Sequence, residues 1–481
     1  MKAGPFRSLH FAIRPRVLAR YLGQLLVIVA GLTLVPLGGA LLGGRPDVAL
    51  RQAVVALAFG ALGGAAMRLR CTDRVQANEA LVVTALVFVL PGVAMTYPLM
   101  AYGIAPLDAL FEAVSGITTT GLSTLATLEG QPRAFLFARA WLQWIGGLGV
   151  VALALAFVIP AGVAAKRLGF DPRESPDYVG GTRAHARRVL GVYLVLTAGA
   201  IALCVAAGMH GFESLVIGMA AVSTGGFSTT DASLAGLAGP ARTAVCLACL
   251  AGALSFSRYY GGALRKSLRD PQIWILFGLV AAGAAALGLG LRGHEASPWR
   301  HAAWMSLSAQ TTAGFSTLPV AELPATAKLV LIVQMFIGGE VGSTAGGLKI
   351  LRVFVLLQLV RALVLRASMP RGSVLLLRVG GSRLRSEEIE AAAAVAVAYA
   401  SVLVLSWLPF LAYGHDPLDA LFDVVSALGT VGLSAGTVGP DLQPALKAVL
   451  CLDMIMGRVE IFAFFVLAFP GTWLGRRRSS E

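Results

Sequence analysis

The sequence has few charged residues for its length. Only 13% of its 481 residues are Asp, Glu, Lys or Arg, whereas 57% are hydrophobic. Soluble domains carry about 25% charged residues, so this composition excludes an ordinary soluble protein. Many apolar runs approach the roughly 20 residues that a helix needs to cross a bilayer, and the alternating segments of a transmembrane barrel are missing. We therefore predict an all-α polytopic protein embedded in the lipid bilayer.

Cysteine and histidine are also scarce, and their spacing favours neither a metal site nor redox chemistry. Cys246 and Cys249 have CxxC spacing, but their neighbours are apolar and no second pair follows. We interpret these cysteines as small packing residues. The six histidines show no metal-ligand spacing. A membrane enzyme would need clustered His, Asp or Cys at one membrane face, and none is found, so we expect no catalytic residues.

Acidic residues are missing where basic ones gather. The net charge is +14, and short basic loops at 68–74, 166–188 and 258–269, with arginines at 476–478, alternate with acidic segments. This asymmetry is typical of the positive-inside rule, so we place these loops and both termini in the cytoplasm. Because the basic residues are not interleaved with aromatic ones, we expect no nucleic-acid partner.

A short stretch occurs four times between long apolar runs. It places hydroxyl residues before a glycine, which is followed by an apolar residue and, in turn, by a serine. The four copies lie at 118–124, 223–229, 311–317 and 429–435. Repetition of this pattern favours four loops that converge on one axis.

Each stretch follows a segment that is too short to cross a bilayer. The first and fourth segments nearly match, PLDALFEAVS from Pro106 and PLDALFDVVS from Pro417. Proline and acidic residues suit the first turn of a helix. A short helix followed by irregular backbone between two spans predicts a re-entrant loop. The acids have two open interpretations, because they could cap these helices or attract cations to a channel mouth.

The resulting organisation is a two-helix hairpin followed by four parallel repeats. We expect the hairpin at 1–78 and the repeats at 79–184, 185–270, 271–388 and 389–481. Each repeat would contain an outgoing span, a short helix and a returning span, such as 241–257 in the second and 445–469 in the fourth. A glycine-rich segment interrupts the third returning span, and 374–385 is expected to form a short hairpin that turns at two glycines. A coupled secondary transporter is the main rival, but it would show inverted halves.

Four such loops suit cation dehydration. Backbone carbonyls replace the hydration shell without fixed charge, and glycine permits the torsions that aim them at one axis. Together with QWIGGLGVV at 143–151, GSTAGGLK at 342–349 and MGRVEIF at 456–462, the stretches make nearly the whole chain resemble the Trk/Ktr/HKT superfamily of potassium transporters, in its TrkH-like branch. That resemblance implies a bacterial inner-membrane protein with ten spans and a pseudo-fourfold arrangement. It also implies a homodimer, a cytosolic TrkA-like nucleotide-binding subunit, and K⁺ as transported ion without an organic cofactor.

The resemblance also implies which residues bind potassium. In the plant relatives, a serine at the first filter glycine goes with sodium permeation, so a glycine at 121 favours potassium. The stretches lack the longer TVGYG of potassium channels, and looser selectivity is expected. The implied filter residues are Thr119, Thr120, Gly121, Thr224, Gly225, Gly226, Thr312, Ala313, Gly314, Thr430, Val431 and Gly432.

The resemblance implies that the glycine-rich interruption is an intramembrane gating loop below the filter. A phosphate loop is excluded, because Lys349 does not follow a glycine as GK[ST] requires, but a packing kink is an alternative. The resemblance places Arg458 beneath the filter as a cation barrier, although an ion pair with Asp453 is also open. Glu340 departs from the small neutral residues of the family, and its partner, Arg458 or Lys349, is left undecided. The implied gate residues are Gly338, Gly339, Glu340, Gly342, Ser343, Thr344, Gly346, Gly347, Lys349 and Arg458.

Overall fold

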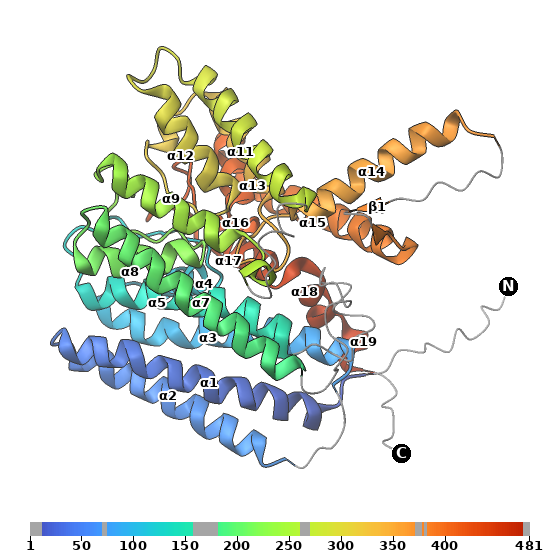
Figure 1. The fold of residues 1–481 in the computed structure, drawn as a ribbon. Helices are drawn as coiled ribbons and strands as arrows, with labels where there is room; N and C mark the ends of the chain where they lie inside the picture. Colours follow the sequence, from blue (N-terminus) through green and yellow to red (C-terminus); the bar gives the residue numbers. More distant parts are fainter. Residues whose placement is uncertain are drawn as a thin grey trace, which may run out of the picture.

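The computed structural model describes residues 12–69, 75–156, 181–259, 270–370, 378–379 and 382–474. These residues are helical apart from connecting segments and one pair of two-residue strands. Helices from every part of the chain surround a common centre (Figure 1). The expected basic loops at 68–74, 166–188 and 258–269 and the arginines at 476–478 lie wholly or largely outside the described residues. Their position in the cytoplasm therefore stays a prediction.

The chain begins with a closely packed pair of helices, α1 (Pro15–Leu42) and α2 (Pro46–Met67). Proline opens each helix, where its missing N–H costs no hydrogen bond. Gly23 and Gly63 face each other between them, and a Cβ on Gly63 would lie 2.6 Å from the Gly23 carbonyl oxygen. Small residues allow this approach, which is a common way for membrane helices to associate.

Four repeats follow, each with an outgoing helix, a short helix and a returning helix or helix pair. The first two contain α3 (Ala77–Leu99), η1 (Met100–Tyr102), α4 (Pro106–Ile117), α5 (Arg133–Ala156), then α7 (Gly181–Ala206), α8 (Gly211–Val222), α9 (Gly239–Ala253) and η3 (Phe256–Tyr259). The last two contain α11 (Pro271–Gly290), α12 (Pro298–Gln310), η4 (Val320–Glu322), α13 (Ala325–Ile337), α14 (Ile350–Ala367), β1 (Arg378–Val379), β2 (Ser382–Arg383), α15 (Ser386–Ala412), α16 (Pro417–Leu428), α17 (Pro444–Arg458), α18 (Glu460–Ala468) and α19 (Pro470–Trp473).

Most of the long apolar helices belong to the initial pair or to the outgoing position of a repeat, although the returning helix α5 also has 24 residues. Six helices among the described residues are long and apolar enough to cross a bilayer, and all belong to the initial pair or to the outgoing position of a repeat. The returning helices α9, α13 and α17 have only 15, 13 and 15 residues. At about 1.5 Å per residue they reach roughly 20–23 Å, less than the ~30 Å hydrocarbon core. The returning half of these repeats is therefore completed by irregular backbone or a second helix.

Two returning spans differ from the sequence expectation. The span expected at 241–257 ends as a helix at Ala253, and the single span expected at 445–469 is wrong, because α17 and α18 are separate helices. At the second break Glu460 has a φ of 57°, which a continuous helix does not permit. Both breaks turn the chain toward the 338–349 segment. The interruption expected in the third returning span is present between α13 and α14.

The expected short hairpin is also present. Strands β1 and β2 pair antiparallel, with Arg378 opposite Arg383 and Val379 opposite Ser382. The two glycines at which it was expected to turn, 380–381, lie outside the described residues.

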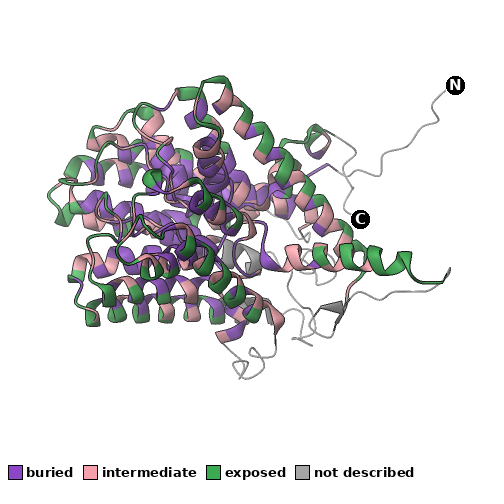
Figure 2. Cartoon of the chain, turned by 90° about the horizontal axis from the view of Figure 1, so that it is seen from above, coloured by how far each residue is buried: buried purple, intermediate pink, exposed green. Residues whose placement is uncertain are grey.

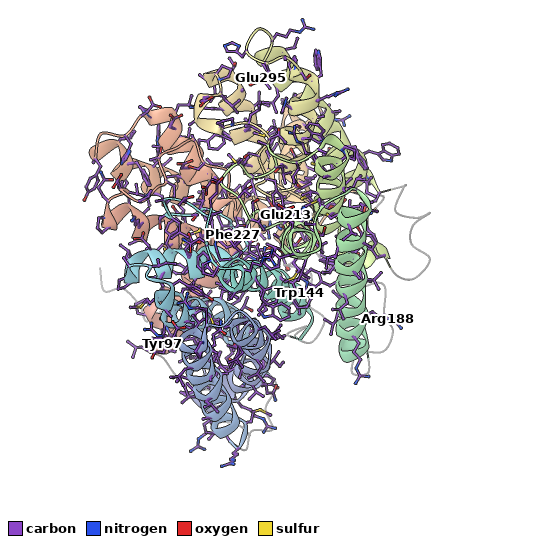
Figure 3. All side chains as sticks on the ribbon, turned by 90° about the vertical axis from the view of Figure 1, so that its left-hand side faces the viewer. Tyr97, Trp144, Arg188, Glu213, Phe227 and Glu295 are labelled. Carbon is purple, nitrogen blue, oxygen red and sulfur yellow. The ribbon has the colours of Figure 1, made fainter. Side chains whose placement is uncertain are left out.

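Burial follows distance from the centre of the bundle. The last two turns of the short helices are buried, whereas α14 and the outer faces of the long helices expose large apolar side chains (Figure 2). Figure 3 shows Trp144 and Phe227 inside the molecule and Arg188 at its edge. The two ends of the described chain meet, since Ile13 N donates to Thr472 O at 2.9 Å. Exposed apolar faces around a polar centre suit a protein surrounded by lipid.

Candidate functional site

The four repeated stretches share one unusual backbone shape. Helices α4, α8, α12 and α16 end directly before them. Each stretch then has a threonine in the left-handed region, followed two residues later by a glycine with positive φ. Left-handed torsions cost a β-branched residue roughly 1–3 kcal/mol and persist only where the surroundings impose them. The φ values are Thr119 55° and Gly121 98°, Thr224 51° and Gly226 81°, Thr312 55° and Gly314 73°, and Thr430 49° and Gly432 98°.

The four stretches close into a ring. A Cβ on each of these glycines would collide with the carbonyl oxygen of the residue that precedes the equivalent glycine in the next stretch. The order runs through all four stretches and returns to the first, so the ring tolerates only glycine at these positions. The opposed pairs are Gly121 with Gly225, Gly226 with Ala313 (2.6 Å), Gly314 with Val431, and Gly432 with Thr120.

Side chains of the short helices hold the stretches from behind. In the first repeat Gly121 N donates to Ser115 Oγ at 3.0 Å, and Ser123 Oγ donates to the Glu112 carboxylate at 2.5 Å. Arg139 neutralises Glu112 at 2.8 Å. The near-identical helix of the fourth repeat acts in the same way, with Gly432 N donating to Ser426 Oγ (3.0 Å) and Ser434 Oγ to Asp423 (3.0 Å).

Two glutamines that the sequence interpretation did not single out also contact this region. Gln143 on α5 accepts from Phe227 N at 3.1 Å and donates to the Gly225 carbonyl, so it clamps the second stretch. Gln310 at the end of α12 donates to Gly338 O at 2.6 Å. Both side chains are fully buried. Their signal in the sequence was a polar residue within an apolar run, which is costly unless it has a partner.

A second ring of contacts joins neighbouring repeats. Near the start of each returning helix, a basic residue meets the short helix of the next repeat. Two of these contacts are cation–π pairs and two are salt bridges, and the last one closes the circle. They are Arg133 with Phe212 (5.4 Å), Arg242 with Trp304 (5.2 Å), Lys328 with Asp419 (2.6 Å) and Lys447 with Asp108 (2.6 Å).

These contacts bear on whether the acids of the short helices cap and brace the helices or attract cations. Asp416 caps α16 by accepting from Leu418 N and Asp419 N, both at 3.0 Å. Asp108 and Asp419 pair with lysines, and Glu112 pairs with an arginine. Capping and bracing therefore account for these four carboxylates, which leaves them little free charge with which to attract cations.

The segment 338–349 lies against the ring. It contacts two stretches, through Gly346 N to Thr312 Oγ1 (2.7 Å) and Gly347 N to Gly429 O (3.1 Å), and the last residue of α8, through Thr344 Oγ1 to Val222 O (3.0 Å). All the residues that the resemblance assigns to the gate, except Arg458, belong to this one segment.

Arg458 reaches the same segment from the end of α17. Its Nη1 donates to Thr344 O at 2.7 Å and its Nη2 to Gly146 O at 2.9 Å. Asp453, the alternative partner, instead accepts from Ser406 Oγ at 2.6 Å. Arg458 is thus a buried cation held by carbonyl dipoles and not by a carboxylate.

Glu340 has neither of the partners that the sequence suggested. Its carboxylate pairs with Arg258, which follows α9, at 2.8 Å. Lys349 donates to the Ala345 carbonyl, and Arg458 is engaged as described above. The two proposed pairings of Glu340 are therefore wrong, because the fold brings a third cation from another repeat to the carboxylate.

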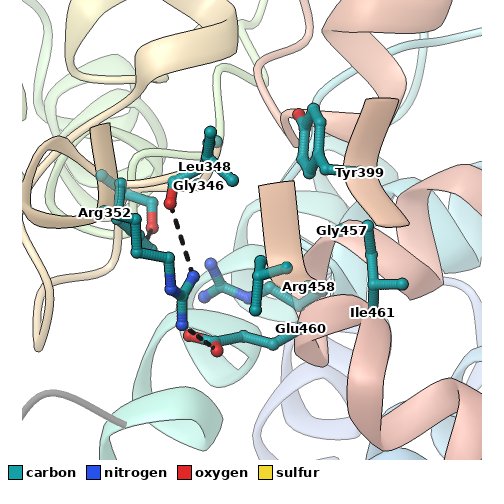
Figure 4. Close-up of a pocket in the computed structure, with 12 residues that line it drawn as sticks. Gly346, Leu348, Arg352, Tyr399, Gly457, Arg458, Glu460 and Ile461 are labelled. Carbon is teal, nitrogen blue, oxygen red and sulfur yellow. Dashed lines mark hydrogen bonds and ion pairs between the residues drawn. The ribbon is translucent and has the colours of Figure 1, made fainter. Parts of the chain in front are cut away.

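A cavity of about 50 Å³ lies between this segment and the residues around the end of α17 (Figure 4). Three cations line it, Lys349, Arg352 and Arg458, with one acid, Glu460. Arg352 and Glu460 form a salt bridge at 2.5 Å.

Within the described part of the chain no cluster of His, Cys, Asp and Glu could hold a metal ion. The oxygens gathered in the ring are neutral carbonyls and hydroxyls, which suit a weakly held monovalent cation.

Comparison with known proteins agrees with this architecture. The family model "TrkH: Cation transport protein" matches residues 48–269 and 274–471. The chain is 30% identical to the Trk system potassium uptake protein TrkH of Escherichia coli strain K12 over 480 residues, covering 95% of this chain and 99% of the relative. It is also 30% identical to the TrkG protein of the same strain, over 76% of this chain and 79% of the relative.

A solved structure shows the same fold. The crystal structure of the potassium transporter TrkH from Vibrio parahaemolyticus superimposes with a TM-score of 0.85 at 28% identity, covering 96% of this chain and 100% of that one. The predicted all-helical membrane fold is thereby confirmed. With its matched family model, its near full-length relatives and this shared fold, the chain belongs to the TrkH family of cation transport proteins.

Proposed function

We propose that this protein takes up potassium ions across the bacterial inner membrane and performs no covalent chemistry. The closed ring of four strained Thr-Gly stretches carries this proposal. A cation gives up its water only where oxygens replace it, and neutral carbonyls do so without a fixed charge that would trap the ion. Both relatives from Escherichia coli strain K12 are named potassium uptake proteins, which supports potassium as the ion.

The ring residues would act as the selectivity filter. Carbonyls of Thr119, Thr224, Thr312 and Thr430, and of the residues that follow them, are the candidate ligands. Gln143 already occupies one lone pair of the Gly225 carbonyl, so the second repeat would contribute less freely than the others. Unequal contributions of this kind agree with a looser filter than that of a fourfold-symmetric channel.

The segment 338–349 would act as the gate. It is hydrogen-bonded to two stretches and to the end of α8, and Arg458 lies buried beside it. A buried cation there would repel potassium until the segment and Arg458 move together. Glycines at 338, 342 and 347 have positive φ, so this backbone conformation depends on them.

The assembly and regulation of this protein are proposed from its similarity to the same Trk system relatives. The relatives belong by name to a Trk system, which suggests a partner subunit. We infer a homodimer with one pore per chain, regulated by a cytosolic nucleotide-binding subunit of the TrkA type. Both termini would lie in the cytoplasm, in line with the contact between Ile13 and Thr472.

Radioactive rubidium uptake into potassium-loaded liposomes tests the proposal. Liposomes holding the purified full-length chain should accumulate rubidium, and external potassium should compete better than sodium. A Gly314→Val variant, whose Cβ collides with Val431 O in the ring, should fold but lose uptake. Empty liposomes set the background. The proposal fails if no cation moves through the wild-type chain, with or without a TrkA-type subunit.

A further inference from the structure

The 338–349 segment, which we call the gate segment, is docked on the end of the second repeat. Helix α9 stops at Ala253, and the backbone that follows runs beside the gate segment. Four hydrogen bonds join the two. They are Glu340 N to Ala253 O (3.3 Å), Phe256 N to Gly342 O (3.1 Å), Thr344 N to Gly252 O (3.2 Å) and Thr344 Oγ1 to Gly252 O (2.9 Å).

A buried ion pair reinforces this docking. The Arg258 guanidinium makes two bonds to the Glu340 carboxylate, Nε to Oε2 at 2.8 Å and Nη2 to Oε1 at 3.0 Å. Ser255 N adds a third bond to Oε2 at 2.9 Å. The Glu340 side chain is 0% exposed and that of Arg258 is 9% exposed. Paired, charge-assisted bonds of this kind are the strongest and most directional that side chains make.

Arg258 and Glu340 differ in the partners that each one keeps when the other is neutralised. Arg258 has a second acidic partner, Asp270, at 2.8 Å. Glu340 has only the Ser255 N–H besides Arg258 among the bonds that its carboxylate makes in the described residues. Loss of the arginine therefore leaves a buried carboxylate without a counter-charge, which is more costly than the reverse.

We propose that Arg258 and Glu340 form a latch that holds the gate segment in its closed position. Opening would detach the segment from residues 252–258, and the two charges would separate and be solvated. Both residues act by positioning the gate and do not contact the ring. This inference rests on the proposed function, since a latch has meaning only if the segment gates a pore.

Resting rubidium uptake by the full-length chain in liposomes, without a partner subunit, tests the latch. Arg258→Gln should raise uptake about tenfold, which corresponds to about 1.4 kcal/mol of closed-state stability. Glu340→Gln should raise it less, because Arg258 keeps Asp270. The double variant Arg258→Gln/Glu340→Gln should stay above wild type but below Arg258→Gln, because the pair is lost but no carboxylate is left buried alone. Potassium preference over sodium should stay unchanged throughout.

The matched control is Glu79→Gln. Glu79 is also a fully buried carboxylate that pairs with an arginine, Arg14, at 2.9 Å, but it makes no bond to the gate segment. Its loss should leave resting uptake at the wild-type level. If Arg258→Gln does not yield a folded, monodisperse protein, Glu340→Asp shortens the side chain and weakens the same pair while keeping the charge, and a smaller rise is expected.

The outcomes separate the latch from the proposed function. Wild-type resting uptake in folded Arg258→Gln and Glu340→Gln variants, with normal partner-activated uptake, would overturn the latch alone. A rise in the double variant equal to the product of the two single rises would mean that the residues act independently, and would also overturn it. Absence of uptake in every chain under every condition would instead count against potassium transport itself.

Discussion

At the scale of single residues, the ring is defined by torsion angles that its sequence only partly favours. Four threonines occupy a region that suits glycine, with φ between 49° and 55°. A left-handed threonine followed by a residue and then a glycine with positive φ turns successive carbonyls away from their regular helical direction. Four equivalent strained positions indicate that the ring requires this backbone, since random strain would not repeat in register.

Replacing Gly121 by serine should weaken discrimination against sodium. The new Cβ would meet the Gly225 carbonyl at a backbone φ of 98°, so the first and second stretches must separate. We expect the potassium-to-sodium ratio, measured by ion competition in the liposome assay, to fall roughly tenfold, or about 1.4 kcal/mol.

The control for this variant is Gly130→Ser in the same repeat. Gly130 has a similar positive φ of 83°, but no atom lies within 4 Å of its Cβ position. It imposes comparable backbone strain without touching the ring. Equal loss of selectivity in both variants would show that the ring contact is not the cause.

At the scale of elements, the molecule divides its helices between two tasks. The initial pair and the outgoing helices are long and apolar, whereas the returning helices α9, α13 and α17 are short. Breaks after α9, α13 and α17 bring Arg258, the gate segment and Glu460 together on one side of the ring. Irregular backbone at membrane depth persists only where protein or a watery cavity surrounds it.

The pair between Arg352 and Glu460 should restrain the gate segment less than the latch does. It joins the first turn of α14 to the break before α18 at 2.5 Å, but Glu460 is 30% exposed and the pair lines a cavity. Partly solvated pairs contribute little. Glu460→Gln should raise resting rubidium uptake about two- to threefold, clearly below Arg258→Gln. A larger rise than that of Arg258→Gln would reverse the order in which these restraints are ranked.

At the scale of the whole molecule, the circle closes where the fourth repeat meets the first. Lys447 on α17 pairs with Asp108 on α4, and Asp108 also accepts from Thr124 Oγ1 at 2.7 Å, just beyond the first ring glycine. This chain of contacts connects residues 339 positions apart. The contacts of Asp108 with Lys447 and Thr124, which form the seam between the fourth and first repeats, therefore hold the first stretch through long-range tertiary contacts.

A double-mutant cycle at this seam should show strong coupling. Lys447→Met and Asp108→Asn should each destabilise the protein, and together they should cost less than their sum by about 0.5–3 kcal/mol. Unfolding in detergent mixtures, followed by circular dichroism, measures this. Asp47→Asn, which breaks an exposed pair with Arg45, should leave stability nearly unchanged. Additive effects at Lys447 and Asp108 would mean that the two charges do not interact.

The features of the fold that depend on local sequence signals could be predicted from the sequence. Apolar run length predicted a helical membrane protein. The recurring Thr-Gly stretches, and the matching helices from Pro106 and Pro417, predicted short helices that end in re-entrant loops. Glycines at 338, 342 and 347 marked the interruption of the third returning span. Each of these signals depends on residues close together in the chain, so spacing and composition suffice.

The contacts between residues of different repeats could be identified only from the tertiary structure. The partner of Glu340 is Arg258, 82 positions away, and neither Lys349 nor Arg458. The break between α17 and α18 falls at Val459 and Glu460, where no proline or glycine indicates the end of a helix. It coincides with contacts that Arg458 and Glu460 make with other repeats. Long-range pairing depends on the closure of all four repeats into one ring, and no local pattern encodes the geometry of that closure.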